Sequence, residues 1–196
     1  MTLDLKAAEY TLGGLRPFPV AITTVDGGRT NGLISLSGGT MSIVAEAPRV
    51  SISLTKYNLT DSMVTSSGVF AMHLLGNDPE IIDKNLEILM TLGGTSGRDG
   101  DKMGGLRTKE GVTGCPILLD ALSYVEGRVV HRLDCDECTF YVADVVASER
   151  LNRGGRLNIG EAWGKLPAEW LAAYEISHHP QVASARAMRG LPPLDH

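Results

Sequence analysis

Short segments with the composition of β-strands follow one another along this chain, without a regular alternation of strand and helix. Val20 to Val25 is rich in β-branched residues, Arg49 to Thr55 alternates polar and apolar residues, and Val69 to Leu75 is extended and apolar. The 23 glycines and 9 prolines favour frequent turns. This pattern predicts a mainly β fold, a closed antiparallel barrel with peripheral helices.

Two hairpins are expected from turn residues. Asp26-Gly27-Gly28 supplies the positive-φ positions of a tight turn after the first strand. Further along, Ala121 to Leu133 and Thr139 to Ala147 read as two long strands joined by the polar turn Asp134 to Cys138.

Helix signals are fewer. Thr60 can cap a short helix that stops at Gly68. Asp78 is a suitable N-cap, followed by Pro79 at the first helical position and an apolar stripe that ends at Gly93-Gly94. A last short helix is expected over Pro167 to Glu175, and no periodicity is visible from His178 to His196.

Length and composition predict one domain over residues 1–196, with a core at about 18–147 and a C-terminal extension at 148–196. The net charge of -5 argues against nucleic acid as a main partner. The N-terminal sequence MTLDLKAAEYTLGGL shows neither a signal peptide nor a membrane span, and three cysteines are too few for a disulfide framework. We therefore expect a cytoplasmic protein that does not associate with membranes.

The segment from Thr91 to Leu106 contains six glycines together with both signs of charge. It is not a Walker A motif, because Lys102 follows an aspartate and precedes a methionine. Ser96, Arg98 and Lys102 could instead pair with a phosphate through charge-assisted hydrogen bonds. A solvated loop without a ligand is the alternative.

A second polar cluster, Thr30-Asn31-Gly32, leads into an apolar strand, and a third begins after the strand that ends at Thr55. In the third cluster, Asn58 and Thr60 lie where a helix should start, and helix N-termini attract anions. Thr60 could equally be only the N-cap of that helix.

The order of these segments resembles that of the flavin reductase-like FMN-binding split-barrel proteins. The resemblance rests on PVAITTV, TNGLISLSGGTMSIVAEAPRVSISL, NLTDSMVTSSGVFAMHLL, TSGRDGDKM and YVADVVA in succession, from about Phe18 to Ala147. The element SGRDGDKM is most similar to the flavoredoxin-like branch.

The resemblance implies a six-stranded antiparallel split barrel that forms a homodimer, with FMN near the dimer interface. By position, one strand would line the isoalloxazine, and two further segments would contact the ribityl phosphate. The first set is Thr30, Asn31, Gly32, Leu33, Ile34 and Ser35, and the second is Asn58, Thr60, Ser96, Arg98 and Lys102. The chemistry would then be that of the flavin, while the protein supplies position and electrostatics.

One position departs from the family pattern. Many members that use NAD(P)H have Gly-Asp-His before the last long strand, whereas this chain has Glu137 at the apparent histidine position. We expect an FMN-dependent oxidoreductase that takes electrons from NAD(P)H. A flavoredoxin-type electron-transfer protein fed by a protein partner and a non-catalytic flavin carrier are the alternatives.

The same turn contains Cys135 and Cys138, a spacing found in redox dithiols and zinc sites. Because the pair lies in a strand-to-strand turn and no second ligand pair follows it, we expect two turn cysteines and no metal. Cys115 is expected to be a buried thiol, and Trp163 and Trp170 either pack on the barrel or cover the flavin.

Overall fold

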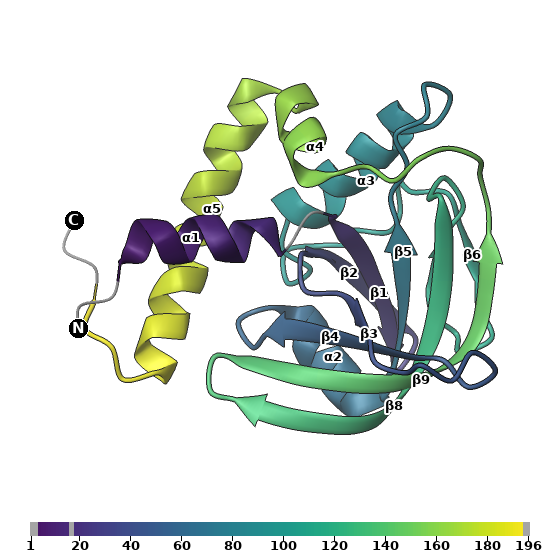
Figure 1. Cartoon of the computed structure of the whole chain (residues 1–196), viewed down its shortest axis with the longest axis horizontal. Coiled ribbons are helices and arrows are strands. Elements are labelled where there is room, and N and C mark those ends of the chain that lie inside the picture. The colour runs from purple at the N-terminus through teal and green to yellow at the C-terminus, as the bar shows by residue number, and fades with distance from the viewer. Residues whose placement is uncertain (1–3, 16–17, 194–196) are drawn as a thin grey trace.

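The computed structural model of the chain describes residues 4–15 and 18–193 (Figure 1). The strands in these residues are β1 (Val20–Asp26), β2 (Arg29–Ser35), β3 (Gly39–Thr40), β4 (Arg49–Thr55), β5 (Val69–Leu74), β6 (Thr108–Glu110), β7 (Pro116–Leu118), β8 (Ser123–Cys135) and β9 (Cys138–Arg150). The helices are α1 (Leu5–Gly14), α2 (Leu59–Ser67), α3 (Ile82–Gly94), α4 (Ile159–Lys165) and α5 (Ala168–Met188).

The main sheet has seven antiparallel strands in the order β2-β1-β5-β8-β9-β4-β3. The mainly β split barrel with peripheral helices is confirmed. The strand number differs from the expected six because the two-residue strand β3 pairs with the edge of β4. The sheet curls enough to bring β2 near β4, and two register shifts in the β8–β9 ladder add curvature.

The strands predicted from local patterns are confirmed. β1 and β2 form a hairpin in full register, with Gly27 and Gly28 at φ values of 56° and 81°. β4 has the predicted bounds, and β5 differs by one residue. The β8–β9 hairpin is longer than expected, since its strands leave only Asp136 and Glu137 in the turn.

Two predicted helix starts are wrong. Helix α2 does stop at Gly68, but its N-cap is Asn58, and Thr60 lies inside the helix with its hydroxyl directed to Asn31. Helix α3 does end at Gly94, but it begins at Ile82. Asp78 instead accepts a hydrogen bond from the Glu80 amide and forms a turn.

The C-terminal region is more helical than expected, and α1 was not predicted at all. α5 extends over 21 residues and includes Pro180, whereas the sequence predicted a helix only to Glu175. Both α1 and α5 lie to the left of the sheet in Figure 1, and neither buries a residue. α5 contacts the core beside α3 through the partly buried side chains of Trp170 and Leu171, near the start of the helix.

The core has two main parts that position the site. One lies between α3 and the outer face of the sheet and contains Leu86, Leu89 and Leu92. The other fills the barrel interior and contains Ile22, Ile52 and Tyr141. β2 lies between the two parts and contacts both, because Ile34 packs against the first part and Leu33 belongs to the second. Among the described residues, no helix is both long and apolar enough to cross a membrane.

Candidate functional site

Three segments that are distant in sequence meet at Asn31 of β2. Asn31 is 3% exposed, and its Nδ2 donates to the hydroxyl of Thr60 in α2 at 3.1 Å. Gly97, in the loop after α3, packs directly against the same amide, so that a Cβ at this position would overlap it. The structure therefore brings together Asn31, Thr60 and the glycine-rich loop, which the resemblance assigned to one site.

Two arginines lie around this contact. Arg98 donates through its guanidinium to the Tyr57 carbonyl at 2.7 Å, and its Cζ lies 5.9 Å from the centre of the Tyr57 ring. Arg29 donates to the Gly97 carbonyl at 2.6 Å. Both arginines are exposed, so each has donors to offer to a ligand. Sequence analysis missed Arg29, Tyr57 and Gly97, because no local pattern distinguishes them from ordinary turn residues.

The N-terminus of α2 opens beside Arg98. Asn58 has an extended backbone, and its carbonyl accepts from the Asp61 amide at 3.1 Å. Its side chain makes no capping hydrogen bond, so it does not satisfy the amides of Leu59 and Thr60. Ser96 is exposed on the facing loop, where its hydroxyl accepts from the Arg98 amide at 3.2 Å. Asp61 is the acidic residue of the first turn, but it is buried and accepts from the Tyr141 hydroxyl at 2.7 Å.

Lys102 lies beneath the loop and not at its surface. Its ammonium donates to the carbonyls of Gly32 at 2.9 Å and Leu92 at 2.6 Å, and the residue is 7% exposed. Burial lowers the pKa of Lys102 to about 8. In this arrangement the lysine ties the loop to β2 and to the end of α3, while Arg98 and Ser96 remain outside.

β2 is an edge strand of the main sheet, so one row of its backbone groups faces away from β1. The Gly32 carbonyl points outward, as its bond to Lys102 shows, and antiparallel alternation directs the backbone groups of Thr30 and Ile34 the same way. The side chains of Leu33 and Ser35 are buried, Leu33 in the barrel core and Ser35 against the Ser37 hydroxyl at 2.8 Å. Any ligand along this strand would therefore meet mainly backbone groups.

The remaining predicted positions lie elsewhere. Glu137 is in the β8–β9 turn, where its carboxylate lies 3.8 Å from Nε of Arg189 at the end of α5. Cys135 and Cys138 flank this turn, and Cys115 is fully buried. Among the described residues, no group of three or more His, Cys, Asp or Glu side chains could hold a metal ion.

Trp163 and Trp170 form an aromatic cluster with α5. The Trp170 ring stacks on Tyr174 with centroids 5.0 Å apart, and Trp163 meets Tyr174 edge-on at 5.9 Å. Trp170 also covers Gly94, where a Cβ would come within 2.6 Å of the indole nitrogen. The tryptophans thus pack near the start of the glycine-rich loop, next to an open hollow of about 510 Å³ lined by Leu171, Tyr174 and His178.

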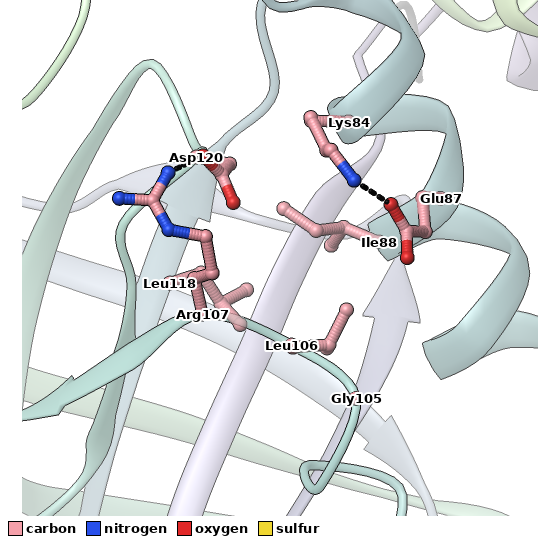
Figure 2. A pocket seen from close by; sticks show the side chains of 8 residues that line it. All are labelled: Lys84, Glu87, Ile88, Gly105, Leu106, Arg107, Leu118 and Asp120. Carbon is pink, nitrogen blue, oxygen red and sulfur yellow. Dashed lines mark hydrogen bonds and ion pairs between the residues drawn. The ribbon is translucent and has the colours of Figure 1, made fainter.

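A second hollow is too small for a cofactor. Figure 2 shows it between the ion pairs Lys84–Glu87 and Arg107–Asp120, with an apolar floor that includes Ile88. Its volume of about 20 Å³ is close to that needed for a single water molecule. Both of its cations are already paired with carboxylates at 2.7 Å.

The family model described as "Flavin reductase like domain" matches residues 14–158. Among characterised proteins, the high molecular weight rubredoxin of Moorella thermoacetica is 26% identical over 153 residues. The aligned part covers 78% of this chain and 62% of that protein, so the chain spans less than two thirds of the relative's length.

Solved structures share the fold at low identity. Flavoredoxin from Methanosarcina acetivorans superposes with a TM-score of 0.60 and 19% identity, covering 76% of this chain and 74% of that chain. An NADH:FAD oxidoreductase from Streptomyces globisporus superposes with a TM-score of 0.64 and 18% identity, covering 81% of this chain and 90% of that chain. At these identities the likeness concerns the fold.

Proposed function

The chain belongs to the flavin reductase-like family, and from this membership we propose that it is an FMN-binding flavoprotein oxidoreductase. In the proposed reaction, electrons from NAD(P)H pass to flavin or to another acceptor. One observation carries the choice of site, namely the open N-terminus of α2 beside Arg98. Uncapped helix amides next to a guanidinium are a donor set suited to a phosphate.

The residues present fit the phosphate end of FMN. Arg98 would supply a charged donor, Ser96 a hydroxyl, and the first turn of α2 the backbone amides of Leu59 and Thr60, next to Asn58. Gly97 allows the loop to lie against Asn31, because a side chain at this position would collide with the amide. The loop would therefore carry its donors at a defined position over α2.

The outer edge of β2 would hold the ring system of the flavin. Backbone groups of Thr30 and Ile34 face outward there and can pair with the polar edge of a ring, whereas the outward carbonyl of Gly32 already accepts from Lys102. Bound FMN would supply hydride and electron transfer, which the side chains of this chain do not perform themselves. The contribution of the protein would be to bind, to orient the ring and to set its electrostatic surroundings.

We further propose a homodimer with the flavin near its interface, as expected from the family resemblance. Its support is apolar surface without a partner in the monomer. Ile43 and Leu133 are 103% and 62% exposed, and α1 and α5 bury no residue. Sedimentation of the FMN-bound protein would test the proposal, and a monomer with full flavin occupancy would contradict it.

A second candidate function is electron transfer with a protein donor in place of NAD(P)H. It is favoured by the tip of the β8–β9 hairpin, which carries Asp134, Asp136 and Glu137. Glu137 is at the apparent position of the histidine that many NAD(P)H-dependent members have. Lys56 pairs with Asp134, and Arg189 lies 3.8 Å from Glu137, so the charge of this cluster is partly compensated. The remaining negative charge repels an anionic dinucleotide but suits a basic protein surface. The structural similarity to flavoredoxin is compatible with this role.

Anaerobic spectroscopy of the FMN-reconstituted protein distinguishes these functions. Rapid bleaching of the flavin absorbance by NADH or NADPH supports the oxidoreductase. Flavin that binds but is reduced only by a reduced iron–sulfur or rubredoxin-type protein supports electron transfer. Flavin reduced by neither would leave a carrier, and failure to bind FMN or riboflavin would reject the proposed site.

A further inference from the structure

Cys135 and Cys138 face each other at the end of the β8–β9 ladder. They are paired residues on opposite strands, separated only by the two-residue turn Asp136-Glu137. Directly opposite residues of an antiparallel pair direct their side chains to the same face of the sheet. Both thiols are therefore on one face of the hairpin, and both are partly accessible.

The backbone geometry at this position suits a disulfide. Directly opposite Cα atoms in an antiparallel ladder are about 4.5 to 5.5 Å apart. Disulfides join cysteines whose Cα atoms are about 4.4 to 6.8 Å apart. The thiols make only weak contacts at present, Cys135 with the Leu133 carbonyl at 3.8 Å and Cys138 with the Cys135 carbonyl at 4.0 Å. Rotation of the two side chains is thus sufficient to bring the sulfur atoms together.

Other roles of the pair are not supported. A metal would need additional ligands, and the described residues contain no cluster of three or more candidate ligands. The pair also lies on two strands and not at a helix N-terminus, where thioredoxin-like dithiols have a stabilised thiolate. Cys115, the third cysteine, is fully buried and separate from the hairpin.

We propose that Cys135 and Cys138 form a redox site that closes to an intramolecular disulfide by exchange with low-molecular-weight disulfides. The thiolate of one cysteine attacks the small disulfide and breaks the S–S bond of that molecule. A mixed disulfide forms, and the first small thiolate leaves. This thiolate takes up the proton that the cysteine lost. The second cysteine then attacks the mixed disulfide. Its proton passes to the second small thiol, so the two protein thiols are oxidised and one small disulfide is reduced to two thiols.

The charges around the pair determine how it should behave. Burial and the neighbouring Cys138, together with Asp134 and Asp136, raise the pKa of the Cys135 thiol. Fewer thiolates at neutral pH make the exchange slow, and the rate should increase with pH. The reduced form gains no stability from a low-pKa thiolate, so the disulfide should resist reduction once it has formed.

The position of the pair connects it to the segment before α2. Cys138 is the ladder partner of Thr55, and the Lys56 amide donates to the Glu137 carbonyl at 3.0 Å. A disulfide would therefore stiffen the hairpin tip. The strand partner of this tip, Thr55, lies three residues before Asn58. The redox proposal itself does not depend on flavin binding, since its site and its chemistry are separate from the flavin donors.

Intact-mass spectrometry of the folded chain tests the proposal. The chain is reduced, desalted and incubated with oxidised glutathione, and its remaining thiols are then alkylated under denaturing conditions. Oxidised wild type should carry no glutathione and one alkyl group, on Cys115. Once this alkyl group is subtracted, its mass should be two hydrogen atoms below that of the reduced chain. Dithiothreitol should restore all three thiols.

Variants provide the matched controls. Cys135→Ser and Cys138→Ser cannot close the ring, so the fraction that carries glutathione should exceed that of wild type by roughly tenfold or more. Cys115→Ala should behave like wild type. Wild type that stays fully reduced, or that carries glutathione on both hairpin cysteines while circular dichroism shows an intact fold, would overturn the proposal. This outcome is read from wild type alone, so it holds even if a variant misfolds.

Discussion

The guanidinium of Arg98 donates to the backbone carbonyl of Tyr57 at 2.7 Å, across 41 positions of sequence. This contact holds the glycine-rich loop over the start of α2, next to amides that the side chain of Asn58 does not cap. A guanidinium beside helix amides that no side chain caps is the arrangement from which we infer the phosphate site.

Arg98→Ala should weaken FMN binding by roughly ten- to a hundredfold, because a charge-assisted contact to phosphate contributes about 1.5 to 3 kcal/mol. Riboflavin, which lacks the phosphate, should be little affected. Fluorescence titration with both flavins measures the two affinities. Arg107→Ala is the control, since Arg107 pairs with Asp120 beside the small hollow of Figure 2. Equal losses of FMN and riboflavin affinity would reject the assignment of Arg98.

Gly97→Ala should also weaken FMN, by about tenfold or more, because the new methyl group would displace the loop from the Asn31 amide. Gly100→Ala is a matched control in the same loop, where a Cβ meets no atom within 4 Å. The comparison is made by the same titration. If the two alanine variants bind FMN equally well, the contact between the loop and Asn31 does not position the phosphate donors.

Lys102→Met should lower the free energy of unfolding by about 1 to 3 kcal/mol, because it leaves the carbonyls of Gly32 and Leu92 without their donor. Lys84→Met, which removes an exposed ion pair, should leave the free energy of unfolding nearly unchanged. Urea denaturation without flavin provides both values. Unchanged stability with a loss of FMN affinity alone would instead make Lys102 a phosphate ligand, as the resemblance implied.

Acid should destabilise the protein through His73. Its Nδ1 lies 3.1 Å from the Ala21 carbonyl, its Nε2 accepts from the Leu118 amide at 3.1 Å, and burial lowers its pKa to about 4. The folded-state pKa lies below the unfolded value of about 6.5. The unfolded chain therefore binds the proton first, and stability present above about pH 6.5 is lost as the pH falls toward 4.

From these values, His73 alone should reduce the unfolding free energy by about 2 kcal/mol between about pH 7 and pH 5. Urea denaturation at both pH values should show this loss in wild type and a correspondingly smaller loss in His73→Gln, whose side chain does not titrate. An NMR titration of the folded protein measures the same pKa without a variant. A folded-state pKa near 6.5 would contradict the prediction.

Glu137→His should change the rate of flavin reduction by NADH only slightly. The Glu137 carboxylate lies 3.8 Å from Nε of Arg189, and a partner of opposite charge reduces its repulsion of an anionic dinucleotide. Stopped-flow bleaching of bound FMN at low salt measures the rate. An acceleration of tenfold or more would mean that the carboxylate faces the nicotinamide and slows its binding, and Arg189→Ala should then slow reduction further.

Local signals determined much of the scaffold. The glycines at 27 and 28 predicted the first hairpin. A period-two pattern predicted β4, an apolar run predicted β5, and Gly68 and Gly94 marked the ends of two helices. Each signal acts over a few residues, because turn conformation and side-chain alternation depend mainly on the local backbone. Because these segments can be read locally, their order along the chain was sufficient to indicate the family.

Only the tertiary structure decided how the site is assembled. Thr60 is of a residue type that is typical of N-caps, yet its hydroxyl accepts a hydrogen bond from Asn31, 29 positions earlier. Lys102 was expected to contact a phosphate, yet its ammonium is buried and donates to the carbonyl of Gly32, 70 positions earlier. Such contacts depend on which segments the curled sheet and α3 bring together. A side chain that can bond locally or at long range follows the partner that packing provides, and the local sequence does not encode that partner.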